Sequence, residues 1–152
     1  MSISKGKMKI GNRFILSGFL VLMTLLATMT LTTVTSFAAT ASVVNGGTSQ
    51  DLQKAINKAS SGSSISINGT VTIDQTVRIN QNVTLTGSGT LVRENGFGGH
   101  MIEVCYYKEV IMEGITIDGN GVSYSEPAVY IDNGKFQMKS GTIQRNGNSG
   151  VY

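Results

Sequence analysis

The sequence has one cysteine, one histidine and one proline in 152 residues, and it has no tryptophan. The single Cys105 cannot form a disulfide within the chain, and it does not lie where a lipoprotein carries its lipidated cysteine. We interpret it as a small apolar residue, with an intermolecular disulfide as the alternative. His100 follows two glycines in an expected loop and has no second histidine with which to share a metal. We therefore expect no site at His100, no metal and no cofactor.

The sequence also lacks a cluster of basic side chains after its first 41 residues. The whole chain has a formal net charge of +3, from twelve Lys and Arg and nine Asp and Glu. Four of the basic residues lie near the start, at Lys5, Lys7, Lys9 and Arg13. The rest of the chain therefore has eight basic and nine acidic residues, a net charge of −1. Because such a domain cannot neutralise a row of phosphates, we expect no nucleic-acid partner.

Residues 1–41 have the features of a signal peptide. A basic head precedes an apolar run from Phe14 to Phe37, and small residues then offer cleavage after Ala38 or after Ala41. The alternative is an uncleaved membrane anchor, because the run is long enough to cross a bilayer of about 30 Å. Threonines within the run and the small residues after it favour cleavage. We therefore expect an extracellular, secreted or cell-wall-associated protein that no longer contacts a membrane after cleavage.

Three segments of the chain repeat one pattern about once every 26 residues. The segments are 83–92, 110–118 and 136–144. Within them Thr90, Thr116 and Thr142 fall at identical intervals, and each is followed by Leu or Ile. A repeat of this length marks a solenoid, in which each unit buries its apolar face only against its neighbours.

Apolar and polar residues alternate from Ile65 onward, as in the pairs Ile65/Ile67 and Val83/Leu85. About three such short strands fall in each repeat, so one repeat would close one coil. Matching residues recur at every third strand, which favours parallel stacking over a meander of hairpins. We therefore predict an all-β fold, a parallel β-helix with three strands per coil. Its expected hand is right, from the general preference for right-handed crossovers.

The sequence divides into three predicted regions. Residues 1–41 are the signal peptide, residues 42–62 have a helical pattern and form an N-terminal cap, and residues 63–152 form the coils. Thr48 or Ser49 would begin a short amphipathic helix that covers the open end of the stack. Nothing closes the last coil, so we expect a chain truncated at its C-terminus. Otherwise, more of its own chain or another protomer would contact that end.

Stacked coils would place equivalent outward residues in columns, about 4.8 Å apart. One predicted column contains Arg78, Glu103, Tyr130 and Tyr152. A flat aromatic face edged by hydrogen-bonding groups could hold a saccharide, so this column is our candidate carbohydrate-binding surface. The alternative, which the pattern favours, is a stacked surface ladder with no ligand. Four aromatic residues lie in loops that could flank it: Phe97, Tyr106, Tyr107 and Tyr124. In a second column Glu113 would lie next to Lys139, a favourable pair of opposite charges.

Several stretches of the chain resemble a known group of proteins. They are Asp51-Leu-Gln-Lys-Ala-Ile, Ile65-Ser-Ile-Asn-Gly-Thr-Val-Thr-Ile, Val83-Thr-Leu-Thr-Gly and the Gly-x-Thr-Ile strands. From about Asp51 to Tyr152 the chain resembles the N-terminal part of bacterial right-handed parallel β-helix proteins of the pectin-lyase-like superfamily. That superfamily includes pectate and pectin lyases, polygalacturonases and non-catalytic surface proteins. The resemblance therefore implies the fold and leaves the activity open.

The sequence contains no recognisable catalytic constellation. Ile117-Asp-Gly-Asn-Gly121 resembles a stretch that is structural in polygalacturonase-like sequences, so we interpret Asp118 as part of a coil turn. Inverting glycoside hydrolysis needs two carboxyl groups about 6.5–9.5 Å apart, and pectate-lyase chemistry needs an acidic cluster for calcium. Glu103 and Asp132 are the best acidic pair, and we expect both to be solvated surface residues.

Two functions from different classes remain open. The first is a secreted or cell-surface protein, a non-catalytic stalk or adhesive surface with polysaccharide as its candidate partner. The second is the N-terminal part of a polysaccharide lyase or glycoside hydrolase of the pectin or polygalacturonate type, with its active site in downstream coils. A weaker third is a module that stacks end to end through its open coil.

Overall fold

The computed structural model describes residues 42–121 and 123–152, which belong to one compact unit. The predicted signal peptide lies outside the described residues. Within the described ranges, no helix is both long and apolar enough to span a membrane.

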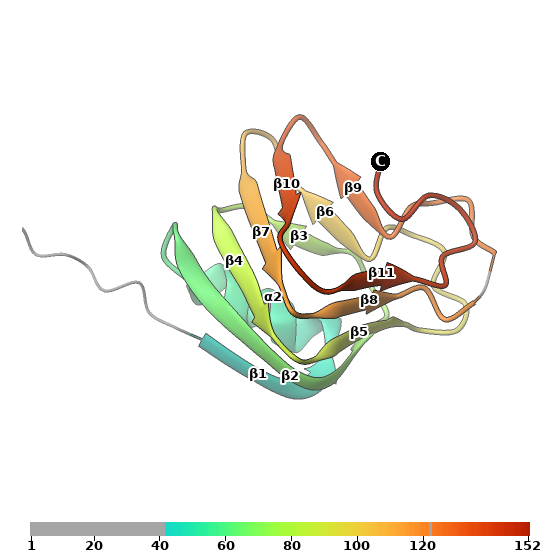
Figure 1. Cartoon of the computed structure of the whole chain (residues 1–152), viewed down its shortest axis with the longest axis horizontal. Helices are drawn as coiled ribbons and strands as arrows, with labels where there is room; N and C mark the ends of the chain where they lie inside the picture. Colours follow the sequence, from blue (N-terminus) through green and yellow to red (C-terminus); the bar gives the residue numbers. More distant parts are fainter. Residues whose placement is uncertain (1–41, 122) are drawn as a thin grey trace, which may run out of the picture. The chain divides into compact units, whose positions relative to one another are not determined.

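The described residues form one helix and a series of short strands. In chain order they are β1 (Ser42–Thr48), α2 (Ser49–Lys58), β2 (Ser63–Ile73), β3 (Val77–Ile79), β4 (Val83–Gly87), β5 (Thr90–Arg93), β6 (Ile102–Val104), β7 (Glu109–Glu113), β8 (Thr116–Asp118), β9 (Val129–Ile131), β10 (Lys135–Met138) and β11 (Thr142–Gln144). The pairings between these strands are parallel. The strands stack into a β-solenoid of about four turns (Figure 1), which confirms the predicted all-β parallel architecture.

Two sheets form the walls of the solenoid. The larger has the order β10-β7-β4-β2-β5-β8-β11, with β1 beside β2, and the smaller has the order β3-β6-β9. The larger sheet bends at the long β2 and so forms two walls. The first part of β2, Ser63–Ile67, pairs with β4, and its last part, Thr70–Ile73, pairs with β5. The strands β4, β5 and β6 then form one complete coil with three strands, as the repeat predicts.

The register of the strands matches the repeat in the sequence. Thr90 lies opposite Thr116, and Thr116 lies opposite Thr142. Glu113 is the last residue of β7, and Lys139 directly follows β10 in the next coil. Glu113 Oε1 and Lys139 Nζ are 2.9 Å apart, so the predicted pair of opposite charges is confirmed. Equivalent residues therefore meet in space, as parallel stacking requires.

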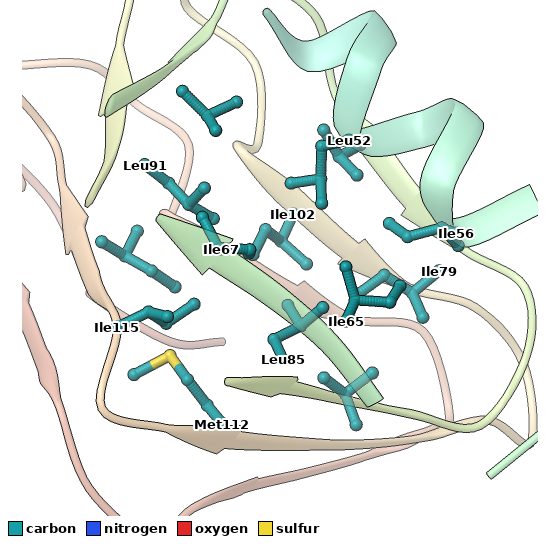
Figure 2. Close-up of a cluster of buried hydrophobic side chains, with 14 of the residues drawn as sticks. Leu52, Ile56, Ile65, Ile67, Ile79, Leu85, Leu91, Ile102, Met112 and Ile115 are labelled. Carbon is teal, nitrogen blue, oxygen red and sulfur yellow. The ribbon is translucent and has the colours of Figure 1, made fainter. Parts of the chain in front are cut away.

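The inward side chains of the coils and the helix form one continuous hydrophobic core. Figure 2 shows part of it, with side chains from α2, β2, β4 and β7 pointing toward one another. Ile65, Leu85 and Ile102 are completely buried. Full burial of one such side chain contributes roughly 1.5–3 kcal/mol. The alternation of apolar and polar residues is thus what closes each coil around the core.

The helix α2 covers the first coil. Its apolar residues Leu52 and Ile56 are completely buried, and the helix packs against β1, β2 and β3. At its start, the backbone N–H of Thr48 donates to the Asp51 carboxylate at 3.1 Å. This hydrogen bond keeps the pKa of Asp51 below its usual value. The predicted amphipathic helix and its start at Thr48 or Ser49 are confirmed.

The sequence-based interpretation missed β1. We expected a helical pattern throughout 42–62, but Ser42–Thr48 is a strand that pairs with β2. Only Val44 of this strand is buried, so it has no alternating pattern to reveal it. The strand forms because the edge of β2 otherwise has unpaired backbone groups.

Burial decreases in the last coil. Phe136 and Ile143 are half-buried and Met138 is 42% exposed, whereas their partners in the preceding coil, Met112 among them, are completely buried. No further described coil covers these side chains.

Candidate functional site

The candidate surface lies on the outer face of the β3-β6-β9 sheet. The register places Arg78 opposite Glu103, and Glu103 opposite Tyr130. A single β-bridge between the residues just before Tyr130 and Tyr152 extends the column by one coil. The structure therefore brings together the four residues that the repeat assigned to one column.

The first two members of the column form an ion pair. Arg78 Nη1 lies 2.7 Å from Glu103 Oε2, and the Glu103 side chain is only 12% exposed. Gln53 of α2 accepts a hydrogen bond from the Arg78 N–H at 2.8 Å and donates one to the Arg78 carbonyl oxygen at 2.9 Å. These contacts attach the helix to the sheet, and the two charges compensate each other. Such a pair at the surface contributes about 1 kcal/mol or less.

Three aromatic rings are stacked at the other end of the column. The rings of Tyr130 and Tyr152 are nearly parallel, at 8°, with centroids 6.1 Å apart. His100 also stacks on Tyr130, with a centroid distance of 4.6 Å and an angle of 12°. Tyr152 is 76% exposed. Its ring is therefore accessible to a ligand.

His100 is a member of this site that the sequence did not predict. It lies in the loop before β6, and its Nδ1 atom is 3.4 Å from Oε2 of Glu126. Nδ1 is inaccessible to solvent and makes no well-aligned hydrogen bond within the described part of the chain. The loops between strands have unequal lengths, so the repeat could not align His100 or Glu126 with Tyr130.

A cleft of about 300 Å³ opens beside the two tyrosines. Its lining residues are Ser125, Glu126, Pro127, Tyr130, Asn148, Ser149 and Tyr152. Asn148 joins the two loops of the wall, because its Nδ2 donates to the Ser125 carbonyl oxygen. Its Oδ1 accepts the N–H of the neighbouring Ser149 at 2.8 Å. Glu126 supplies the charge among these lining residues. The volume matches the lower end of the range for small-molecule sites.

Two of the loop aromatics that we expected beside this surface pack elsewhere. Phe97 and Tyr124 lie on the guanidinium group of Arg93, whose Cζ atom is 5.6 Å and 5.1 Å from the two ring centroids. Arg93 is only 2% exposed and donates to the carbonyl oxygens of Phe97, at 3.1 Å, and Gly99. Burial lowers the pKa of Arg93, although a guanidinium remains charged in proteins. This buried cation holds the loop that carries His100.

The carboxylate of Asp118 is committed to a different contact. Asp118 is 4% exposed and accepts hydrogen bonds from Arg145 Nε at 2.8 Å and Arg145 Nη2 at 2.6 Å. Gln144 Nε2 and the N–H of Asn120 donate to it at 3.0 Å and 2.8 Å. Arg145 is the main reason why the pKa of Asp118 is lowered. The geometry agrees with our interpretation of Asp118 as a structural turn residue, now with a partner in the next coil.

The best acidic pair from the sequence, Glu103 and Asp132, is diagonal in the strand register, because Glu103 lies opposite Tyr130 and Asp132 follows Tyr130 by two residues. Glu103 is paired with Arg78, whereas Asp132 is exposed beyond the end of β9, and no hydrogen bond joins the two carboxylates. Across residues 42–121 and 123–152, no three His, Cys, Asp or Glu residues are grouped closely enough to hold a metal ion.

Comparisons with protein-family models, with curated proteins and with solved structures give no match for this chain. The fold is established by the parallel strand pairings. The interpretation of the surface around Tyr130 depends on its geometry and chemistry.

Proposed function

We propose that this chain is a secreted or cell-surface β-helix protein that contacts carbohydrate without cleaving it. The observation that carries this proposal is the parallel stack of His100, Tyr130 and Tyr152 beside a cleft. The C–H groups of a pyranose ring pack well on an exposed aromatic face, and its hydroxyl groups need polar neighbours. Ser125, Asn148 and Ser149 supply polar groups along the cleft.

The resemblance to the pectin-lyase-like superfamily supports the proposal in a general way. Proteins of that group include many that act on or contact polysaccharides, and the predicted leader supports export. A stack of coils is also rigid, because each strand is hydrogen-bonded to the coil below and the coil above. Such a scaffold holds aromatic rings at fixed spacing, which suits a repetitive polymer.

A non-catalytic role agrees with the state of Asp118 and Glu103, the two carboxylates that are paired with arginines. A general acid for glycoside hydrolysis needs a raised pKa, so that it is protonated at neutral pH. Asp118 has the opposite shift because of Arg145. Glu103 is held by Arg78 at 2.7 Å. Both carboxylates therefore serve contacts between coils.

The proposal is tested by binding of oligosaccharides to the purified protein, measured by calorimetry. Replacing Tyr152 with Ala removes the exposed ring, and we expect at least a fivefold loss of affinity, because stacking on an aromatic ring is worth about 1 kcal/mol. Tyr107→Ala is the matched control, since Tyr107 is 73% exposed and does not line the cleft.

Equal losses for the two variants, or no binding of any saccharide, would contradict the proposal. Release of reducing ends or of unsaturated sugars from a bound polysaccharide would instead support an enzyme.

A further inference from the structure

The geometry points to a cationic amino sugar as the preferred ligand of the cleft, ahead of neutral sugars and uronic acids. This inference rests on the proposed function and adds the chemical class of the ligand. It follows from the charge of the cleft, which the repeat pattern in the sequence does not reveal.

The first argument is the carboxylate of Glu126. Glu126 is the charged residue in the lining of the cleft, and its side chain is 45% exposed, so it is accessible to a ligand. The basic side chain within ion-pair distance of this carboxylate is His100, whose Nδ1 lies 3.4 Å from Glu126 Oε2. In the same column as the tyrosines, Arg78 and Glu103 compensate each other. Glu126 is therefore the charged group that the lining of the cleft presents to a ligand.

The second argument is the pair of tyrosine rings. The face of an aromatic ring is negative and attracts cations. Tyr130 and Tyr152 line the same cleft as Glu126, so ring faces and a carboxylate act on one small volume. An ammonium group near Glu126 would gain from both, while the carbon skeleton of the sugar packs on Tyr152. A uronic acid would place its carboxylate beside Glu126, and like charges at close range disfavour binding.

The inference is tested with three tetrasaccharides on the purified protein: β-1,4-linked glucosamine, cellotetraose and galacturonate. The first two share a backbone and differ by the amine, so their comparison isolates the charge. The buffer is acidic enough to protonate the amines, and the measurement is repeated at neutral pH with the trimethylated glucosamine tetramer, whose charge does not titrate. We expect glucosamine to bind about fivefold more tightly than cellotetraose, and galacturonate to bind most weakly.

The Glu126→Gln variant keeps the shape of the side chain and removes its charge. It should reduce the preference for glucosamine over cellotetraose to what the tyrosine rings supply, and added salt should weaken glucosamine binding more in the unaltered protein than in the variant. If cellotetraose or galacturonate binds as tightly as glucosamine and Tyr152→Ala still loses affinity, the charge inference is wrong and the carbohydrate function stands. If no tetrasaccharide binds, or if Tyr152→Ala binds normally, the proposed function fails as well.

Discussion

Replacing Arg145 with Met removes the guanidinium group that binds the Asp118 carboxylate of the preceding coil. Asp118 is 4% exposed and would keep only the donors of Gln144 and the Asn120 backbone. Hydrogen bonds to a charged group contribute about 1.5–3 kcal/mol. The Arg145 side chain is itself 56% exposed, which weakens the pair by solvent screening. We therefore expect the free energy of unfolding to fall by about 2 kcal/mol at neutral pH.

Thermal unfolding followed by circular dichroism measures this loss. For a domain of this size, about 2 kcal/mol corresponds to a decrease in Tm of roughly 10 °C. The effect should also depend on pH. Because the folded-state pKa of Asp118 lies below its usual value of 3.8, the contribution is present above that value and is lost as pH falls through the folded-state pKa. The difference in Tm between the unaltered protein and the Arg145→Met variant should therefore disappear in strong acid.

Lys139→Met is the matched control. It breaks an ion pair with Glu113 in which both side chains are well exposed, at 51% and 38%, so the loss should be below about 1 kcal/mol. Equal losses for the two variants would refute the argument that burial makes the Asp118 contact strong. A gap that persists after Asp118 is protonated would refute its electrostatic origin.

Two further predictions concern the fold. Ile117→Asp should destabilise the protein by more than about 4 kcal/mol, because it places a charge in the core where Ile117 is completely buried. Thr116→Val, on the outer face, should change stability by about 0.5 kcal/mol or less. Urea unfolding measures both variants, and similar effects would contradict the assignment of Ile117 to the core and Thr116 to the surface. Gly141→Ala should lower the free energy of unfolding by about 3 kcal/mol, because Gly141 has a φ of 104° and a Cβ would clash with the Ile115 carbonyl oxygen. Gly96→Ala should lower it by about 1 kcal/mol, because Gly96 has a φ of 87° but open space around the position of a Cβ. Equal decreases in Tm for the two variants would show that the clash is unimportant.

The repeat explains why so much of the fold was predictable. Alternating apolar residues define which side chains point inward, and a fixed interval between Thr90, Thr116 and Thr142 defines which ones meet. Both patterns are local or periodic, so they can be read along the chain. β1 was not predicted, because a strand with only one buried residue, Val44, has no alternating pattern. It exists only because β2 has an edge to pair with.

The site was predictable only in part, for the same reason. Arg78, Glu103 and Tyr130 share a register position, so the sequence alone determined that they form a column. The tertiary structure decided what lies on either side of it. His100 and Glu126 come from loops of different lengths, and their approach to Tyr130 depends on how each loop folds back over its own coil. Periodicity orders the strands, but packing alone determines where the loops between them place their side chains.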